Sequence, residues 1–294
     1  MMHLMRVHRS LPGSLVRATR DEVEPIARLR GLLIPAVLIA LCTGASQPAS
    51  QDAATDSSTA AGSWTELPRI GEEFTYAVDY SGVVGAYIKV KVGEGPKNQP
   101  GSRVLTAYLA TTPLVQQIWR IRDKLMSLYV PDQGRTVATR LWEDENGKRM
   151  FREEKYHDGG VQVVEKRPDQ ERAFDVQSQP PLLDGFSALF ELRRRPLQPD
   201  TVEPARIYLN RKIYDCAAAV RRDTITYQGQ DVPVLRVDPV LTYQGKAVND
   251  VSFSFWLSDD DKRVPLKIEA DVRYGKLAGT LLPPKESAAV ATDG

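Results

Sequence analysis

The clearest pattern in the chain is an alternation of apolar and polar side chains near its end. From residue 264 to 273 every second residue is apolar, and the residues between are charged apart from one proline. This period of two is typical of a strand that buries one face. A similar run at residues 252–257 places Phe253, Phe255 and Leu257 on one side and Trp256 on the other. With polar residues 258–262 between the runs and a third run at 276–282, we expect an antiparallel meander with one apolar face.

A short helix at residues 183–195 supplies a partner for that face. Asp184 is a suitable N-cap and Pro196 ends the pattern, while Phe186, Leu189 and Phe190 share one side at helical spacing. We place this side against the sheet. Three arginines at residues 193–195 complement the helix dipole on the surface. An anionic head group bound by these arginines is the alternative interpretation.

The segment between residues 72 and 130 predicts further short strands, interrupted at residues 112–120. There Thr112 can cap a short helix and Pro113 suits its first position, with Leu114, Ile118 and Ile121 on one face. Turn residues follow at 131–134, 145–148, 157–160, 227–230 and 243–246. The sequence Asn-Gly at 146–147 is the strongest of these signals, because a type I′ turn needs positive φ at both positions. We therefore predict a mainly β (α+β) fold, a curved antiparallel sheet or half-barrel meander packed on one or two short helices.

The N-terminal region has the pattern of a secretory signal. An apolar run of 11 residues, 32–42, follows Arg28 and Arg30 and is followed by small residues, so we expect residues 1–45 to be a cleaved signal peptide. A membrane-spanning helix needs roughly 20 apolar residues, and a lipoprotein anchor at Cys42 is the remaining alternative. Residues 46–66 are rich in Ser and Ala and predict a disordered linker. Residues 67–284 then form a single domain, and residues 285–294 a disordered tail.

Composition argues against a nucleic-acid-binding protein and against a fold held by disulfides. Signal cleavage takes six arginines and three acids from 39 basic and 38 acidic residues, which leaves 33 and 35 and argues against nucleic acid as a partner. Cys216 is then the only cysteine, so no internal disulfide forms and the fold depends on its apolar core. The predicted mature chain contains no membrane-spanning segment.

Residues for nucleophilic or metal chemistry are sparse. His157 is the only histidine after cleavage and lies in a predicted turn, Ser187 fits an early helical position, and Cys216 fits a strand. One histidine and one cysteine exclude the usual zinc sets, and the acids at 259–261 lack the alternation of a calcium loop. We expect no metal, no cofactor and no enzymatic activity.

Paired carboxylates are the one catalytic arrangement that the sequence leaves open. Asp123 and Asp184 each adjoin apolar residues that could raise their pKa. The simpler alternatives are an ion pair of Asp123 with Arg120 or Arg122 and the helix cap for Asp184. A hydrolase that uses two such acids is the least favoured hypothesis.

Four blocks of the chain together resemble a bacterial family catalogued as domain of unknown function 3108. They are EEFTYAVDYSGVVGAYIKVKV, RIRDKLMSLYV, DGFSALFELRRRPL and FSFWLSDDDKRVPLKIEADVRYGKLAGTLL, in this order over residues 68–282. The chain lacks the tryptophan that many relatives carry near residues 80–85. The resemblance implies an exported β-rich envelope protein and supplies no catalytic or binding residues. By fold analogy it is similar, more loosely, to periplasmic lipoprotein carriers, whose concave face holds acyl chains.

These observations favour an exported envelope protein that binds a lipid or another apolar ligand without catalysis. The candidate ligand contacts are aromatic: Trp119, Trp142, Phe186, Phe190 and Trp256. An envelope assembly or interaction factor, which holds a protein partner and has no ligand cavity, is the alternative. An apolar cavity on the concave side of the sheet favours the first hypothesis, and a filled interior the second.

Overall fold

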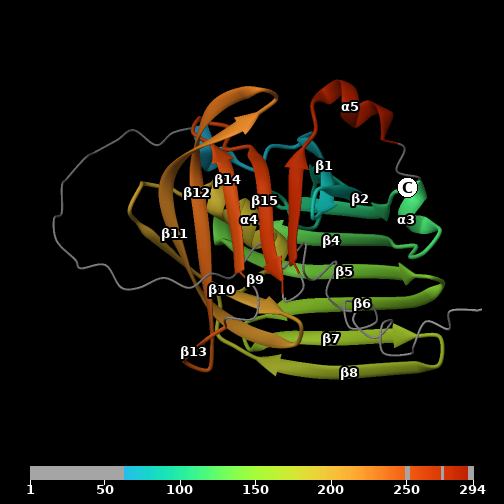
Figure 1. Ribbon diagram of the computed structural model, residues 1–294. Helices are drawn as coiled ribbons and strands as arrows, with labels where there is room; N and C mark the ends of the chain where they lie inside the picture. The colour runs from blue at the N-terminus through green and yellow to red at the C-terminus, as the bar shows by residue number, and fades with distance from the viewer. Residues whose placement is uncertain (1–62, 249–251, 273–274, 291–294) are drawn as a thin grey trace, which may run out of the picture.

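The computed structural model describes residues 63–248, 252–272 and 275–290, which build one long, curved, mainly antiparallel sheet around a short helix (Figure 1). The predicted signal peptide and residues 46–62 of the predicted linker lie outside the described residues. The mainly β fold with few helices is confirmed.

The first half of the sheet is a meander in which each strand pairs with the next. Its strands are β1 (Glu73–Tyr80), β2 (Val83–Glu94), β3 (Arg103–Thr111), β4 (Arg122–Val130), β5 (Arg135–Glu145), β6 (Lys148–His157), β7 (Gly160–Arg167) and β8 (Gln170–Gln177). The turn between β5 and β6 has φ of 51° at Asn146 and 81° at Gly147, which confirms the expected positive φ at both positions.

The second half of the sheet crosses over the first. Its strands are β9 (Leu183–Asp184), β10 (Val202–Leu209), β11 (Lys212–Tyr227), β12 (Gln230–Tyr243), β13 (Lys246–Ala247), β14 (Ser252–Ser258), β15 (Pro265–Val272) and β16 (Gly275–Leu281). β16 pairs with β1, so that Leu281 lies opposite Tyr76 and the halves form one continuous sheet with β8 and β9 at its edges. Figure 1 shows β4 to β8 running across the view and β11 to β16 running nearly at right angles to them.

The helices are short. They are η2 (Ser63–Glu66), α3 (Pro113–Gln116), η3 (Pro131–Gln133), α4 (Gly185–Arg193) and α5 (Pro284–Ala289). η2 and most of α5 fall in segments expected to be disordered. α5 begins at Pro284, whose ring presets helical φ, with Pro283 as its N-cap residue, and the hydroxyl of Ser287 donates to the carbonyl of Leu282.

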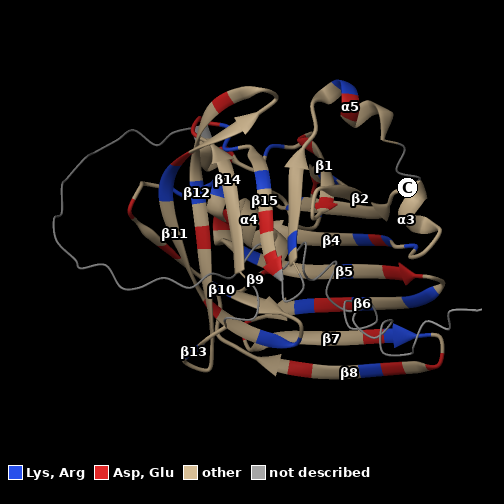
Figure 2. Ribbon diagram, in the orientation of Figure 1, with Lys and Arg blue, Asp and Glu red and all other residues tan. Residues whose placement is uncertain are grey.

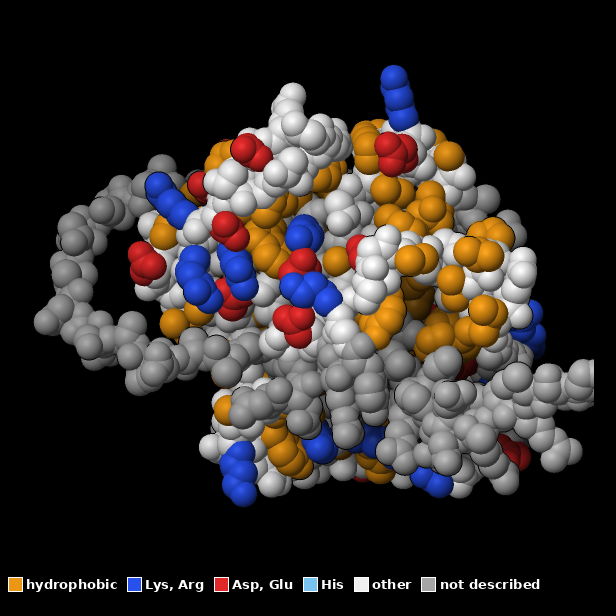
Figure 3. Space-filling model, viewed as in Figure 1, with side chains coloured by type: hydrophobic (Ala, Val, Ile, Leu, Met, Phe, Trp, Pro, Cys, Tyr) orange, Lys and Arg blue, Asp and Glu red, His pale blue; other side chains and the backbone are white. Residues whose placement is uncertain are grey.

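α3 is shorter than the sequence predicts. The helix ends at Gln116 because the chain soon rejoins the sheet, where Ile121 forms a bridge with Glu145 and the Arg120 amide donates to the Asn146 side chain. Leu114 and Ile118 are therefore exposed, and only Ile121 of the predicted apolar face is buried. In Figure 3 apolar side chains gather on the side where α3 and the β1–β2 hairpin lie in Figure 1.

α4 lies between the two halves of the sheet. Asp184 caps it by accepting hydrogen bonds from the amides of Phe186 and Ser187 at 2.8 and 3.1 Å, as the sequence predicts. Phe186 and Phe190 pack in one core with residues of β1 to β4 and of β14. The prediction that this helix covers the apolar face of the terminal meander is confirmed.

A β-bulge in that meander, between β14 and β15, reverses the faces on which Pro265 and Leu266 lie. Leu257 pairs with Pro265 and Trp256 with Lys267, so Leu266 is an extra residue on β15. Leu266 therefore packs with Trp256 and Val234 on the far face, and Pro265 takes its place on the core face. The prediction that Leu266 belongs to the inner apolar row is wrong for this reason.

Candidate functional site

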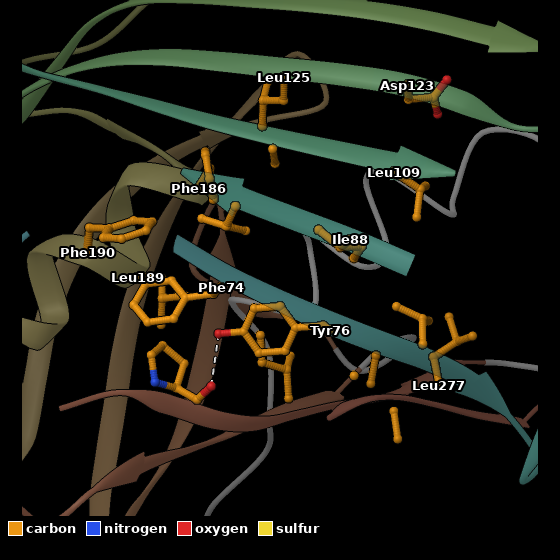
Figure 4. Close-up of a pocket in the computed structure, with 18 residues that line it drawn as sticks. Phe74, Tyr76, Ile88, Leu109, Asp123, Leu125, Phe186, Leu189, Phe190 and Leu277 are labelled. Atoms are coloured by element: carbon orange, nitrogen blue, oxygen red, sulfur yellow. Dashed lines mark hydrogen bonds between the residues drawn. The ribbon is translucent and has the colours of Figure 1, made fainter. Parts of the chain in front are cut away.

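An apolar hollow lies between the two halves of the sheet. Residues of β1 to β4 form one wall, residues of β15 and β16 form the other, and α4 closes one end (Figure 4). The hollow exists because several of the side chains that face it are small: Ala107, Ala270, Ala278 and Gly279. These residues leave room between the layers where larger side chains would meet.

The hollow is narrow. Its cavity volume is about 60 Å³. This volume is well below the roughly 300 to 1,000 Å³ of cavities that hold drug-sized ligands, so the hollow suits a slender apolar chain and not a bulky ring system.

The end of the hollow at α4 is closed by buried aromatic rings. The rings of Phe186 and Phe190, both almost fully buried, meet edge to face at 5.4 Å and 85°. Beside them the buried Tyr76 hydroxyl donates to the Pro265 carbonyl at 2.9 Å, which joins the two walls of the hollow. Burial raises the pKa of Tyr76 above its usual range, so this hydroxyl stays a donor.

The opposite end carries a carboxyl group. Asp123 on β4 is half-buried and is the only acidic or basic residue among the described residues that line the hollow. Its Oδ1 atom accepts a hydrogen bond from the Asp144 amide at 2.9 Å. The pKa of Asp123 is raised to about 7, mainly by burial and also by the negative charges of Glu143, Glu145 and Asp144. The hydrogen bond from the Asp144 amide lowers the pKa and offsets part of this rise. The alternative ion pair with Arg120 is not formed, because Arg120 pairs with Asp144 at 3.2 Å.

A second polar cluster lies on the same face of the sheet, between β6–β7 and the β10–β11 hairpin. Glu165 receives hydrogen bonds from Arg152 at 2.9 Å and from Arg211. Glu154 is buried beside them and accepts from the Tyr156 hydroxyl at 3.0 Å. Burial raises the pKa of Glu154 to about 7, partly offset by Arg152. Since these contacts are between protein groups, the cluster ties strands together.

The aromatic residues singled out in the sequence separate into two groups. Phe186 and Phe190 line the hollow. Trp119 lies at the margin of the core and donates to Glu145 at 2.7 Å. Trp142 is on the outer face against Phe151, and Trp256 is on the far face, where it donates to Asp223 at 2.9 Å. Of the five candidate contacts, only Phe186 and Phe190 line the hollow, because strand alternation turns Trp142 and Trp256 away from it.

The arginines at the end of α4 are not a free cationic surface. Arg193 is fully buried, Arg195 contacts Glu191 and Glu203, and Arg194 donates to the Pro131 carbonyl. The prediction of solvent-exposed arginines is therefore wrong for Arg193. Each cation already has protein partners, which weighs against the anionic head group considered as the alternative.

Other residues considered for chemistry occupy the simpler positions that the sequence favours. Ser187 is buried in the first turn of α4 and donates to Asp184 at 2.5 Å, and Cys216 is a buried residue of β11. The acids at residues 259–261 are exposed in the turn before β15. The described residues contain no cluster of His, Cys, Asp or Glu side chains placed to hold a metal ion. Within the same ranges, no helix is long and apolar enough to cross a membrane.

A family model described as "Protein of unknown function (DUF3108)" matches residues 75–281. The chain belongs to the DUF3108 family. The DUF3108 match runs from β1 to β16 and includes both walls of the hollow and α4, so the resemblance drawn from the four sequence blocks is confirmed.

Among solved structures, this DUF3108 protein is similar to the crystal structure of a beta-barrel-like protein of domain of unknown function DUF1849 from Brucella abortus. The two chains are 12% identical, with a TM-score of 0.48 over 72% of this chain and 96% of the other. No curated protein matches the chain.

Proposed function

We propose that this protein binds a slender apolar or lipid-like ligand in the hollow between β1–β4 and β15–β16. The observation that carries the proposal is the lining itself, in which apolar side chains from six strands and α4 surround space that they do not fill. Burial of an acyl chain there is worth about 0.8 kcal/mol for each methylene group removed from water.

Export to the cell envelope is part of the same proposal. It rests on the apolar run at residues 32–42 behind Arg28 and Arg30, which has the organisation of a secretory signal. An apolar ligand held away from water is a useful cargo in an aqueous compartment between membranes. A non-catalytic role accords with this proposal, and the absence of enzymatic activity remains a prediction.

The proposal is tested with the dye methyl parinarate, an uncharged and slender polyene chain that fluoresces in apolar surroundings. Protein refolded after solvent extraction should give a saturable signal with one site per chain. Ile88→Trp should abolish the signal, because the larger ring enters the hollow from a half-buried lining position. Tyr87→Trp, one residue away on the opposite face of β2, is the matched control and should bind as the original chain does.

The outcomes separate the hypotheses. No saturable dye binding by the original chain, together with no lipid in organic extracts of the purified protein, would reject the binding proposal and favour the assembly factor. Equal binding by Ile88→Trp and Tyr87→Trp would place the ligand outside the hollow.

A further inference from the structure

Asp123 is a carboxyl group at one end of a hollow whose other lining residues are uncharged. At the other end the ring pair of Phe186 and Phe190 closes the space (Figure 4). A ligand that fills the hollow lengthwise therefore has its apolar tail at α4 and its polar end at Asp123. The chemistry of this carboxyl group determines which polar end fits.

The charged groups that face Asp123 are nearly all acidic. Glu143, Asp144 and Glu145 on β5 act on it as negative charges, and Figure 2 shows the acidic end of β5 next to β4. The nearest cations are engaged elsewhere or point away. Arg120 pairs with Asp144 at 3.2 Å, and the ammonium group of Lys124 lies over the rings of Tyr108 and Trp142 at 5.1 and 5.5 Å. Arg122 is exposed, and β3 presents Leu109 opposite Asp123.

No cationic side chain of the described residues pairs with Asp123. An anionic head group would add a further negative charge beside these carboxyl groups, whereas an ammonium group would supply the missing counter-ion. This difference discriminates among ligands that share the same apolar chain.

We propose that the ligand is a single-chain cationic amphiphile, a long-chain amine whose ammonium group pairs with the Asp123 carboxylate while its chain lies in the hollow. This inference rests on the proposed binding function and adds the class of head group. Asp123 Oδ1 is held by the Asp144 amide, so the second carboxylate oxygen is the one that receives the ammonium group.

The pairing makes binding dependent on pH in one direction. Without ligand the pKa of Asp123 is about 7, so near neutral pH part of the protein carries the uncharged acid. An alkylammonium ion, with a pKa near that of lysine at about 10.4, stays charged throughout this range. Amine affinity should therefore rise severalfold from pH 6 to pH 8 and then level off.

The experiment compares dodecylamine, dodecanol and dodecanoate by titration calorimetry below their aggregation concentrations. Chain length is constant, so differences in affinity report the head group. We expect the amine to bind at least tenfold more tightly than the alcohol at pH 8, and the carboxylate to bind most weakly. Asp123→Asn should bring the affinity for the amine down to that for dodecanol in the same variant and remove the pH dependence of amine binding. The asparagine oxygen can still accept from the Asp144 amide, so this variant should fold.

Asp175→Asn, an exposed position on β8, is the matched control and should behave as the original chain does. Tightest binding of dodecanoate, or equal amine affinity in Asp123→Asn and the original chain, overturns the head-group inference and leaves the hollow as a general apolar site. If none of the three ligands binds, the proposed function itself fails.

Discussion

The Arg193 side chain at the end of α4 is fully buried and clamps the Glu72 carboxylate, with its Nη1 and Nη2 atoms 2.8 and 3.2 Å from the two carboxylate oxygens. Its Nε and Nη2 atoms also donate to the backbone carbonyls of Arg263 and Lys262, at 2.9 and 3.0 Å. The guanidinium group therefore makes four hydrogen bonds, and it lies against the rings of Phe74 and Phe190. This one side chain joins α4 to both halves of the sheet, beside the closed end of the hollow.

Glu72→Ala should destabilise the fold strongly, because it leaves a buried guanidinium charge without its counter-ion. Removal of one partner of a buried pair typically costs about 3 to 5 kcal/mol. Glu72 keeps some contact with water, so we expect about 3 kcal/mol lower free energy of unfolding in urea. The control is Asp215→Ala, which removes the exposed pair with Arg206 and should cost less than about 1 kcal/mol. A loss below about 1 kcal/mol for Glu72→Ala, as expected for the exposed control pair, would contradict the importance of the Arg193 pair.

Asp184→Ala should weaken the start of α4 by more than an ordinary cap. Besides the amides of Phe186 and Ser187, the buried Asp184 carboxylate accepts from the hydroxyls of Thr136 and Ser187 at 2.8 and 2.5 Å. Loss of a cap costs about 0.5 to 2 kcal/mol, and the buried donors left without an acceptor add about 1 to 3 kcal/mol. Urea unfolding should show a total near 3 kcal/mol. Ser187→Ala removes a single contact and should cost only about 1 kcal/mol; a cost as large as that of Asp184→Ala would contradict this account.

Local signals in the sequence predict local structure well. The cap at Asp184, the spacing of Phe186 and Phe190 and the turn at Asn146-Gly147 each depend on residues within a few positions of one another. Their interpretation from sequence was therefore confirmed by the structure.

Features that depend on distant pairing could not be predicted in the same way. The burial of Arg193 needs Glu72, 121 residues away, and the outward turn of Leu266 depends on the register between β14 and β15. The apolar residues next to Asp123 in the sequence predict its raised pKa. The hydrogen bond that it accepts from the Asp144 amide depends on the pairing of β4 with β5, so the sequence does not predict it. The hollow itself follows from the way in which β1 to β4 face β15 and β16, which alternation alone does not determine.

Gly147→Ala should destabilise the β5–β6 hairpin by about 1 kcal/mol. Gly147 has φ of 81°, a left-handed conformation that costs other residues roughly 1 to 2 kcal/mol, and a methyl group there would meet no atom within 4 Å. The cost would thus come from the backbone alone. Gly93→Ala in β2 is the matched control, because that glycine does not need positive φ and an added methyl would make ordinary contacts at 3.7 Å. Thermal unfolding should give a lower melting temperature for the first variant and an unchanged or slightly higher one for the second. The reverse order would contradict this assignment.

Glu154→Gln should flatten the decline of stability with rising pH. The carboxyl group of a glutamate in the unfolded chain ionises near pH 4.5, whereas burial raises the pKa of Glu154 in the fold to about 7. Between these values the unfolded chain has lost the proton that the folded chain still holds, so rising pH favours unfolding. The stabilisation from protonated Glu154 is complete below the pKa of the unfolded chain, 4.5, and is lost as the pH rises through the pKa of the fold, about 7. At about 1.4 kcal/mol for each pKa unit, the loss is roughly 3 kcal/mol.

Glutamine stays uncharged and can still accept from the Tyr156 hydroxyl, so the variant should lose this part of the pH dependence and become the more stable protein above pH 7. The raised pKa of Asp123 also makes stability fall with rising pH, and it does so equally in the original chain and in Glu154→Gln. The difference between the free energies of unfolding of these two proteins in urea, from pH 4 to pH 8, therefore gives the contribution of Glu154 alone. Glu171→Gln at an exposed position on β8 should follow the original chain at every pH. Parallel curves for the original chain and Glu154→Gln would mean that Glu154 is ionised in the fold, with Arg152 as its counter-ion.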